Sequence, residues 1–262
     1  MSSNKKIESI VSLFTAVVVV AFSSFSVSAA EASVLLPSDD VYLQQTGMPE
    51  DVLQNMDNDF KAYIAADLKK SDTKLSRTGE ASYQFDYVQT EIIPSISPFA
   101  TTPDSGVSLT AYAFKSGSQI SVYPTYEFTQ DKKPKGRDAF SFQLGAAMRA
   151  YDFGGQVWYK DSSMSSWAVG GSMTANEQYW DGAVYSGTQL GTPDWSMKMK
   201  GCAWVHANVG TGTDKRIAMG YAYNPNKVNI SVSFSTSGSV GLSFSTGSGT
   251  IYTTAKIVNL TY

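Results

Sequence analysis

The chain is poor in the residues that carry most metal and nucleophilic chemistry. It has one cysteine, Cys202, and one histidine, His206, among 262 residues. A single cysteine cannot close an internal disulfide, and a zinc site needs three or four His, Cys or acidic ligands at close spacing. We therefore expect no metal site and no cofactor. Cys202 is expected to be a small buried core residue.

Motifs for nucleotide binding and for serine hydrolysis are also missing. No glycine-rich loop follows a strand and opens a helix, as a phosphate-binding loop does. No Gly-x-Ser-x-Gly sequence is present, so any Ser-His-Asp or Cys-His hydrolase would have to use His206. We interpret His206 as a strand residue with a local hydrogen bond. The sequence leans toward a protein without catalytic activity.

Charge of either sign is scarce. Lys and Arg number 20, Asp and Glu number 23, and charged residues make up 16% of the chain. No basic stripe is present in any segment, which argues against a nucleic-acid partner. The mildly acidic balance also argues against attraction to anionic lipid through bulk charge.

The first thirty residues have the pattern of a signal peptide. Lys5 and Lys6 precede an apolar run from Ile10 to Phe22. This run is shorter than the ~20 residues of a membrane-spanning helix, and small residues suited to a signal peptidase follow it. We expect cleavage near Ala30 and an extracellular mature chain of roughly 230 residues.

One amphipathic helix is predicted near the start of the mature chain. Pro49 stands in a first turn with two acidic residues after it, which suits both the missing N–H of proline and the helix dipole. Apolar residues then recur at spacings of three and four up to Leu68, and two lysines close the segment. We place the helix at about 49–70, within an N-terminal segment that spans 31–79.

The stretch from Gly47 to Leu68 resembles the opening of the mature chain in uncharacterised, signal-bearing secreted proteins of Gram-positive bacteria. The shared pattern is Gly-x-Pro, then Leu-x-x-Met-Asp, then Lys-x-x-Ile. The resemblance covers these residues alone. It implies a bacterial origin and secretion, and it implies no activity.

From about residue 80 onward the chain has the pattern of a β-protein. Short runs of alternating large and small residues are separated by glycine, proline and asparagine turns. Turn signals about every 8 to 12 residues are typical of a sandwich or a barrel. We predict a mainly β fold, with an antiparallel β-sandwich domain over 80–262 and one N-terminal amphipathic helix.

The clearest strand pair lies near the C-terminus. Two runs in which apolar residues alternate with serine, asparagine and glycine flank Ser237 and Gly238, which can supply a tight turn. Period-two alternation predicts a β-hairpin with one apolar face and one polar face. The apolar face consists of Val228, Ile230, Val232, Phe234, Val240, Leu242 and Phe244.

This hairpin supports an alternative function. Strands of membrane barrels show the same alternation, so a pore-forming or membrane-active protein could use the segment 228–246. A membrane would be a partner only under this alternative. The run Val228 to Thr236 reaches the ~9 to 11 residues of a spanning strand, whereas Val240 to Thr246 falls short. An ordinary half-buried antiparallel pair explains the pattern better.

Aromatic residues are the most suggestive feature for binding. They make up 13% of the chain, and many of them lie between residues 158 and 195. Flat rings can stack on sugar faces, although most aromatic residues of a sandwich are simply core. The candidate ligand-binding residues are Trp158, Trp167, Tyr179, Trp180 and Trp195.

Acidic residues support a second alternative, a glycan-active hydrolase. Such an enzyme needs two carboxyl groups ~5 to 9 Å apart, and sequence spacing cannot place a pair. The stretch 176–181, where acids lie beside aromatic residues, is interpreted as an exposed loop rather than a catalytic one. The candidates are Glu91, Glu127, Glu177, Asp181 and Asp194.

The sequence therefore predicts a secreted, non-catalytic binding or surface-interaction protein. A cell-wall glycan or another protein is the expected partner. The membrane-active protein and the glycan hydrolase remain as alternatives.

Overall fold

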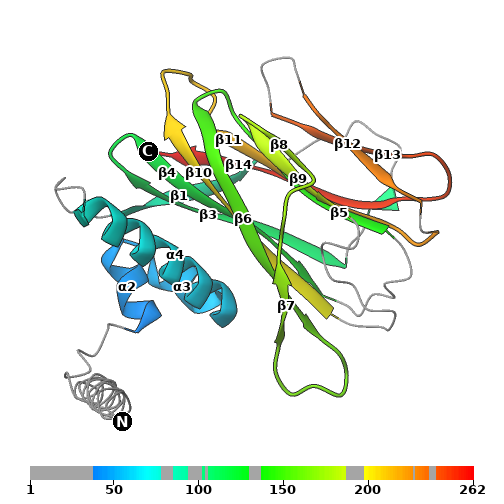
Figure 1. The fold of residues 1–262 in the computed structure, drawn as a ribbon, viewed down its shortest axis with the longest axis horizontal. Coiled ribbons are helices and arrows are strands. Elements are labelled where there is room, and N and C mark those ends of the chain that lie inside the picture. The colour runs from blue at the N-terminus through cyan, green and yellow to red at the C-terminus, as the bar shows by residue number, and fades with distance from the viewer. Residues whose placement is uncertain are drawn as a thin grey trace, which may run out of the picture. The chain divides into compact units, whose positions relative to one another are not determined.

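The computed structural model describes residues 38–77, 85–93, 102–103, 106–129, 137–186, 198–226, 228–235 and 240–262. Asp39–Tyr262 form one unit. The described part is mainly β, with antiparallel sheets and few helices (Figure 1). The predicted signal peptide, Trp195 and the tight turn at 237–238 lie outside the described residues.

The strands form one long sheet and one separate pair. Their bounds are β1 Asp86–Ile93, β2 Thr102–Pro103, β3 Val107–Ser116, β4 Gln119–Phe128, β5 Arg137–Leu144, β6 Met148–Lys160, β7 Ala168–Ser172, β8 Glu177–Tyr179, β9 Gly182–Ser186, β10 Lys198–Val209, β11 Arg216–Asn224, β12 Ile230–Phe234, β13 Leu242–Thr246 and β14 Tyr252–Thr261. The long sheet runs in the order β7-β6-β10-β4-β3-β1-β14-β11-β5-β9-β8, with β2 parallel to β14 at one side. Strands β12 and β13 form the two-stranded sheet.

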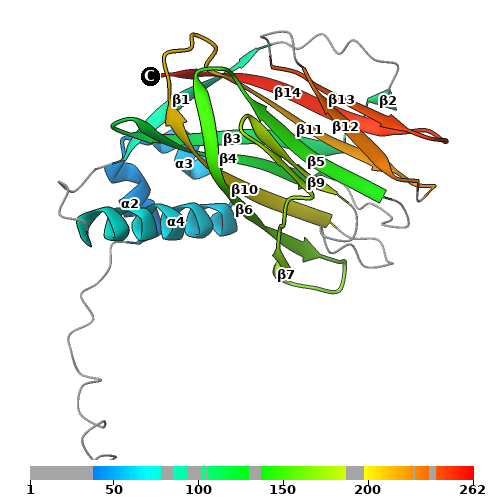
Figure 2. The same ribbon diagram turned by 45° about the horizontal axis from the view of Figure 1, so that its top comes forward.

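The long sheet curls so that its two halves share one core (Figure 2). The ring of Tyr126 on β4 lies 5.0 Å from the rings of Phe140 on β5 and Tyr221 on β11, measured between centroids. At the other side, Phe142 on β5 lies 6.3 Å from Phe153 on β6. Neither half could bury its apolar face alone, so the curl follows from the alternation of apolar residues along each strand.

Three helices of the described chain cover the outer face of one half. They are α2 Asp39–Gln45, α3 Glu50–Asn55 and α4 Asn58–Arg77. Their buried side chains, Phe60 and Ile64 among them, share a second apolar cluster with Tyr123 and Trp158 of the sheet. In that cluster Cys202 is fully buried. None of the described helices is both long and apolar enough to cross a membrane.

The single helix predicted at 49–70 is instead two helices, α3 and α4. The break lies at Met56 and Asp57. The Asp57 carboxylate accepts hydrogen bonds from the N–H groups of Asp59, at 2.9 Å, and Phe60, at 3.3 Å. Asp57 is therefore the N-cap of α4, and an N-cap residue lies outside the helical conformation. The apolar spacing continues across the cap, which is why periodicity alone did not reveal the break.

A buried lysine joins α4 to the sheet. Lys200 on β10 is 0% exposed, and its Nζ lies 2.5 Å from Asp57 and 2.7 Å from Asp59. The same Nζ lies 4.3 Å from the ring centroid of Trp167. A charge out of water needs paired, well-oriented partners, and two carboxylates at the start of α4 supply them. The first turn of the helix is thereby fixed to the beginning of β10.

We expect Lys200→Ala to lower the free energy of unfolding by about 3 kcal/mol, because it removes a buried ion pair and leaves a cavity. Lys198→Ala, on the same face of β10 but exposed, serves as the matched control and should change stability by less than about 0.5 kcal/mol. Urea denaturation of both variants measures the difference. Equal effects of the two substitutions would contradict the role assigned to Lys200.

A buried titratable group lies within β5. The side chain of Asp138 is buried and accepts a hydrogen bond from the Tyr221 hydroxyl, at 2.9 Å. Burial raises the pKa of Asp138 to about 7, although the hydrogen bond from Tyr221 acts in the opposite direction. The folded protein therefore holds a proton that the unfolded chain, with an ordinary aspartate pKa of 3.8, releases.

This difference predicts that stability falls as pH rises. Below about pH 4 both states carry the proton, and between about pH 4 and pH 7 only the folded state keeps it. The stabilisation is lost as pH rises through the folded pKa. We expect the free energy of unfolding of Asp138→Asn to exceed that of the wild type by about 1 to 3 kcal/mol between about pH 5 and pH 8. Denaturation experiments at several pH values measure this difference. Asp86→Asn, at an exposed position, should show no such gain.

Candidate functional site

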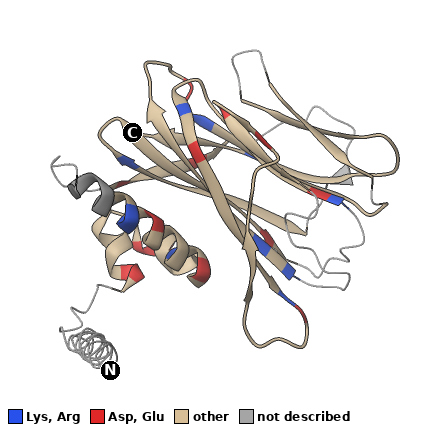
Figure 3. Ribbon diagram, viewed as in Figure 1, with Lys and Arg blue, Asp and Glu red and all other residues tan. Residues whose placement is uncertain are grey.

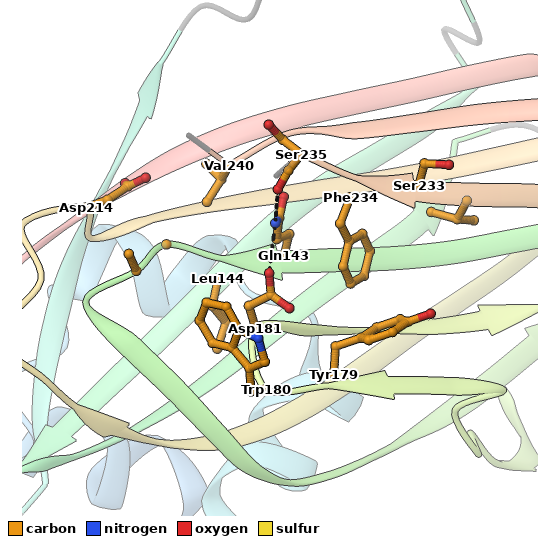
Figure 4. Close-up of a pocket in the computed structure, with 13 residues that line it drawn as sticks. Gln143, Leu144, Tyr179, Trp180, Asp181, Asp214, Ser233, Phe234, Ser235 and Val240 are labelled. Carbon is orange, nitrogen blue, oxygen red and sulfur yellow. Dashed lines mark hydrogen bonds between the residues drawn. The ribbon is translucent and has the colours of Figure 1, made fainter. Parts of the chain in front are cut away.

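The hairpin β12–β13 and the aromatic stretch around Trp180 meet at one cleft. The cleft has a volume of about 580 Å³. Its floor is the end of β5, one wall is β12, and the opposite wall is the turn between β8 and β9 (Figure 4). We call it the hairpin cleft. The side chains that matter below are Gln143, Tyr179, Trp180, Asp181, Asp214 and Phe234.

The hairpin packs its apolar face against the long sheet. Strands β12 and β13 pair antiparallel, as the alternation predicts, and the structure places Val232 opposite Phe244. The floor under them is made of small residues: Phe244 lies over Gly220, where a Cβ atom would meet its ring at 2.6 Å, and over Ala222. The face proposed for a membrane is thus covered by protein in this structure. Each paired strand has five residues, against ~9 to 11 for a spanning strand.

One buried glutamine holds the cleft together. Gln143 on β5 is 3% exposed, and its Nε2 donates to the Asp181 carboxylate and to the Ser235 carbonyl, each at 2.9 Å. Its Oε1 accepts a hydrogen bond from the N–H of Gly241, also at 2.9 Å. One side chain therefore fastens both arms of the hairpin and the opposite wall to the floor (Figure 4).

The aromatic rim of the cleft is exposed and held in place. Tyr179 is 47% exposed and its ring lies edge-on to Phe234, with centroids 5.4 Å apart. Trp180 is 52% exposed, and the Arg149 guanidinium lies 5.1 Å from its ring centroid. The Trp180 carbonyl accepts a hydrogen bond from the N–H of Ala150, at 2.7 Å. Such fixed rings offer contact area without a large loss of side-chain entropy.

The carboxylates of the cleft are all paired. Asp181 accepts the hydrogen bond from Gln143, and Asp214 receives two from the Arg216 guanidinium, at 2.8 and 2.9 Å. Burial acts to raise the pKa of Asp214, but these bonds outweigh it and the pKa lies below its ordinary value. A general acid of a glycosidase needs the opposite shift. Asp214 therefore suits binding better than proton transfer.

The other candidate acids are not brought to this cleft as a pair. Glu177 on β8 does not line the cleft; it accepts a 2.6 Å hydrogen bond from the Tyr179 hydroxyl, a contact that raises the pKa of Tyr179. Glu91 is exposed on β1, and Glu127 lies on β4 beside a different cavity. Asp194 lies outside the described residues. Within the described chain, no group of three or more His, Cys, Asp or Glu side chains could hold a metal ion.

Of the five predicted aromatic contacts, the structure brings two together, Tyr179 and Trp180. Trp158 is 4% exposed and packs under α4 against Phe60. The prediction for Trp158 was wrong because the helix layer covers that face of the sheet, which the local pattern does not reveal. Trp167 is half-buried beside Lys200 and lines a separate cavity, and Trp195 lies outside the described residues.

Sequence analysis missed Gln143 and Arg149 as parts of the site, and it assigned Phe234 only to the apolar face of the hairpin. For Gln143 a signal existed: it is the one polar residue with a long side chain in the run from Ala139 to Leu144. A long polar residue in a strand that is otherwise apolar or small predicts a specific hydrogen-bonding role. Nothing in the sequence indicated that Arg149 lies under Trp180.

Comparison with known proteins gives distant likenesses only. No protein-family model and no curated protein matches the chain. The collagen-binding domain of the Erysipelothrix rhusiopathiae surface protein RspB aligns over 60% of each chain, with a TM-score of 0.31 and 4% identity. The KRT10-binding region domain of the pneumococcal serine rich repeat protein PsrP aligns over 54% of this chain and 87% of its own, with a TM-score of 0.26 and 12% identity. AvmM, described as catalysing macrocyclization in alchivemycin A biosynthesis, aligns over 63% of this chain and 88% of its own, with a TM-score of 0.17 and 12% identity. Likeness at this level carries no argument about the function of this chain.

We expect Gln143→Leu to loosen the hairpin, because it removes the hydrogen bonds that join Gln143 to the Ser235 carbonyl and to the Gly241 N–H. Removing such buried hydrogen bonds costs about 1 to 3 kcal/mol. Hydrogen exchange of the amides over 230–246 should become faster, while exchange in β4 and β10 stays slow. Gln178→Leu, at an exposed position on β8, is the control. Unchanged exchange in the hairpin would refute the role of Gln143.

Proposed function

We propose that this chain is a secreted, non-catalytic binding protein that acts at a cell surface, and that its partner docks in the hairpin cleft. The observation that carries the proposal is the pair of exposed aromatic side chains, Tyr179 and Trp180, at the rim of an open cleft whose walls are fastened by Gln143. Exposed, rigid aromatic residues beside a pocket are the usual centres of binding energy in an interface.

The chemistry of the cleft favours recognition over turnover. Asp181 and Asp214 are both held by hydrogen bonds, and the guanidinium partner of Asp214 keeps its carboxylate ionised. A glycan hydrolase would need an uncommitted acid and base here. The covered apolar face of the hairpin likewise gives no specific support to a membrane-active role.

An extended segment of another protein is the ligand that fits best. Among the described strands, β8 pairs only with β9, and β12 pairs only with β13, so each presents one open edge. Open edges carry unpaired backbone N–H and C=O groups that an added strand can use. Apolar side chains in the cleft, including Leu144 and Phe234, would take alternate side chains of that segment.

The remaining parts of the proposal come from the sequence and the fold together. We interpret the curled sheet as a two-layered β-sandwich, because its halves face each other across one core. We interpret the first thirty residues as a signal peptide that directs secretion. The resemblance of Gly47 to Leu68 to secreted proteins of Gram-positive bacteria supports a bacterial origin.

The binding role predicts a clear result for two substitutions. The mature chain would be tested by surface plasmon resonance against purified extracellular proteins, collagen and keratin included, and against purified cell-wall glycans. We expect binding to a protein of the panel, and a loss of roughly 10- to 30-fold in affinity for Trp180→Ala and for Tyr179→Ala, the size expected for central aromatic contacts. Tyr252→Ala, also an exposed aromatic residue, does not line the cleft and should bind normally.

Three results would overturn the proposal in different ways. Protein binding with unchanged affinity in both cleft variants would move the site elsewhere. Binding to glycans alone, weakened by Trp180→Ala, would replace the polypeptide ligand by a sugar. Release of reducing ends from the glycans, lost in Glu177→Gln or Asp181→Asn, would establish the hydrolase instead.

A further inference from the structure

A second pocket lies around the single histidine of the chain. It has a volume of about 490 Å³ and lies between α4 and the outer face of strands β4, β6 and β10. Its lining includes Asp67, Gln119, Ser121, Tyr151, His206 and Asn208. We call it the His206 pocket. No residue of the hairpin cleft lines it.

A hydrogen-bonded chain organises the floor of this pocket. The Nδ1 atom of His206 lies 2.9 Å from the Ser121 hydroxyl, and its Nε2 lies 3.4 Å from the Asp67 carboxylate. The same carboxylate oxygen accepts a 2.7 Å hydrogen bond from the Tyr123 hydroxyl. An adjacent carboxylate favours the tautomer with the proton on Nε2, so Nδ1 accepts from Ser121. The imidazole is thereby held in one orientation.

Two aromatic rings flank the imidazole. The centroid of the Trp204 ring lies 4.7 Å from that of the His206 ring. The ring of Tyr151 stacks on the His206 ring, with centroids 6.3 Å apart. Tyr151 is 52% exposed. It is the extra residue of a β-bulge, because His206 pairs with Asp152 while Ala207 pairs with Ala150. Bulges re-aim side chains and are frequent beside functional sites.

The pocket also holds polar groups that the fold does not use. Gln119 and Asn208 face each other as a cross-strand pair, next to the pair formed by Ser121 and His206. Within the described chain, neither of the two side-chain amides has a hydrogen-bond partner. Each amide offers two donors and one acceptor to a ligand.

The arrangement of Ser121, His206 and Asp67 resembles a catalytic triad in composition only. Strand β4 lies between β3 and β10, and Ser121 pairs with Phe114 on one side and His206 on the other. The backbone N–H groups around Ser121 are therefore committed to the sheet and cannot form an oxyanion hole. Ser121 as a whole is only 3% exposed. Recognition, not acyl transfer, fits this geometry.

We propose that the His206 pocket binds a neutral saccharide ring. A sugar has an apolar C–H face, which suits Trp204 and Tyr151, and a rim of hydroxyl groups, which suits the free amides of Gln119 and Asn208. Of the charged lining residues, Asp67 is held by the Tyr123 hydroxyl and His206, and Asp152 and Lys70 carry opposite charges, so the remaining charges do not select an ion of one sign. This site is separate from the hairpin cleft and adds glycan recognition to the proposed protein binding.

The histidine itself supplies the reporter for a test. His206 is the only histidine of the chain, so the imidazole ¹H–¹³C cross peaks in an NMR spectrum belong to it without ambiguity. The mature chain would be titrated at constant pH with the methyl glycosides of glucose, galactose, mannose and N-acetylglucosamine. We expect a saturable shift of these cross peaks with at least one of the four sugars.

Matched variants assign the binding to this pocket. Tyr151→Ala and Asn208→Ala, both at exposed positions, should each weaken binding by about tenfold, and Tyr151→Phe should retain it, because stacking on the ring needs no hydroxyl. Tyr179→Ala alters only the hairpin cleft and should leave sugar affinity unchanged. Backbone amide spectra confirm that each variant is folded.

Two outcomes would overturn the proposal. One is the absence of any saturable shift at His206 with the four glycosides. The other is sugar binding that persists in Tyr151→Ala and Asn208→Ala and is lost in Tyr179→Ala, which would place the sugar in the hairpin cleft. Neither result bears on docking of a polypeptide, which is measured separately with the protein panel.

Discussion

The ion pair between Lys200 and the start of α4 is the contact on which the rest of the helix layer depends. Asp57 caps the helix and also accepts the buried ammonium group, so one side chain fixes both where α4 begins and where it lies on β10. Asp67 follows ten residues later, about 15 Å along the helix axis at 1.5 Å per residue. That distance carries its carboxylate to His206, which lies six residues from Lys200 on the same face of β10. A strand rises about 3.3 Å per residue, so the corresponding interval on β10 spans about 20 Å.

Alternation along β10 explains why a single strand serves both a core and a pocket. Residues such as Ala203 and Val205 face the core between the two halves of the sheet. Lys200, Cys202, Trp204 and His206 point the other way, toward the helices and the His206 pocket. Trp204 can lie flat against β6 only because Gly154 is opposite it, where a Cβ atom would meet the indole at 2.5 Å. This wall of the pocket therefore requires both the large side chain of Trp204 and a glycine opposite it.

Much of this architecture follows from period-two alternation. The features that could not be predicted from it all have the same cause. The β-rich character and the apolar face of the hairpin could be predicted, because each strand records which of its faces is apolar. The sequence does not record what later covers that face. Lys200 therefore reads as a surface lysine although it is fully buried, and Trp158 reads as a ligand contact although α4 covers it. The break between α3 and α4 at Asp57 could not be predicted for a related reason: the apolar spacing continues through the N-cap.

The segment from Arg149 to Asp152 borders both candidate sites, and a bulge makes this possible. Arg149 lies under Trp180 at the hairpin cleft, and Ala150 is tied to the Trp180 carbonyl. In an unbroken strand Tyr151 would point inward with Phe153, because side chains alternate between faces. The extra residue at the bulge shifts that alternation, so Ala150 takes the inward position opposite Ala207 while Tyr151 turns out beside His206. A regular β6 would bury Tyr151 in the core and remove its ring from the lining of the His206 pocket.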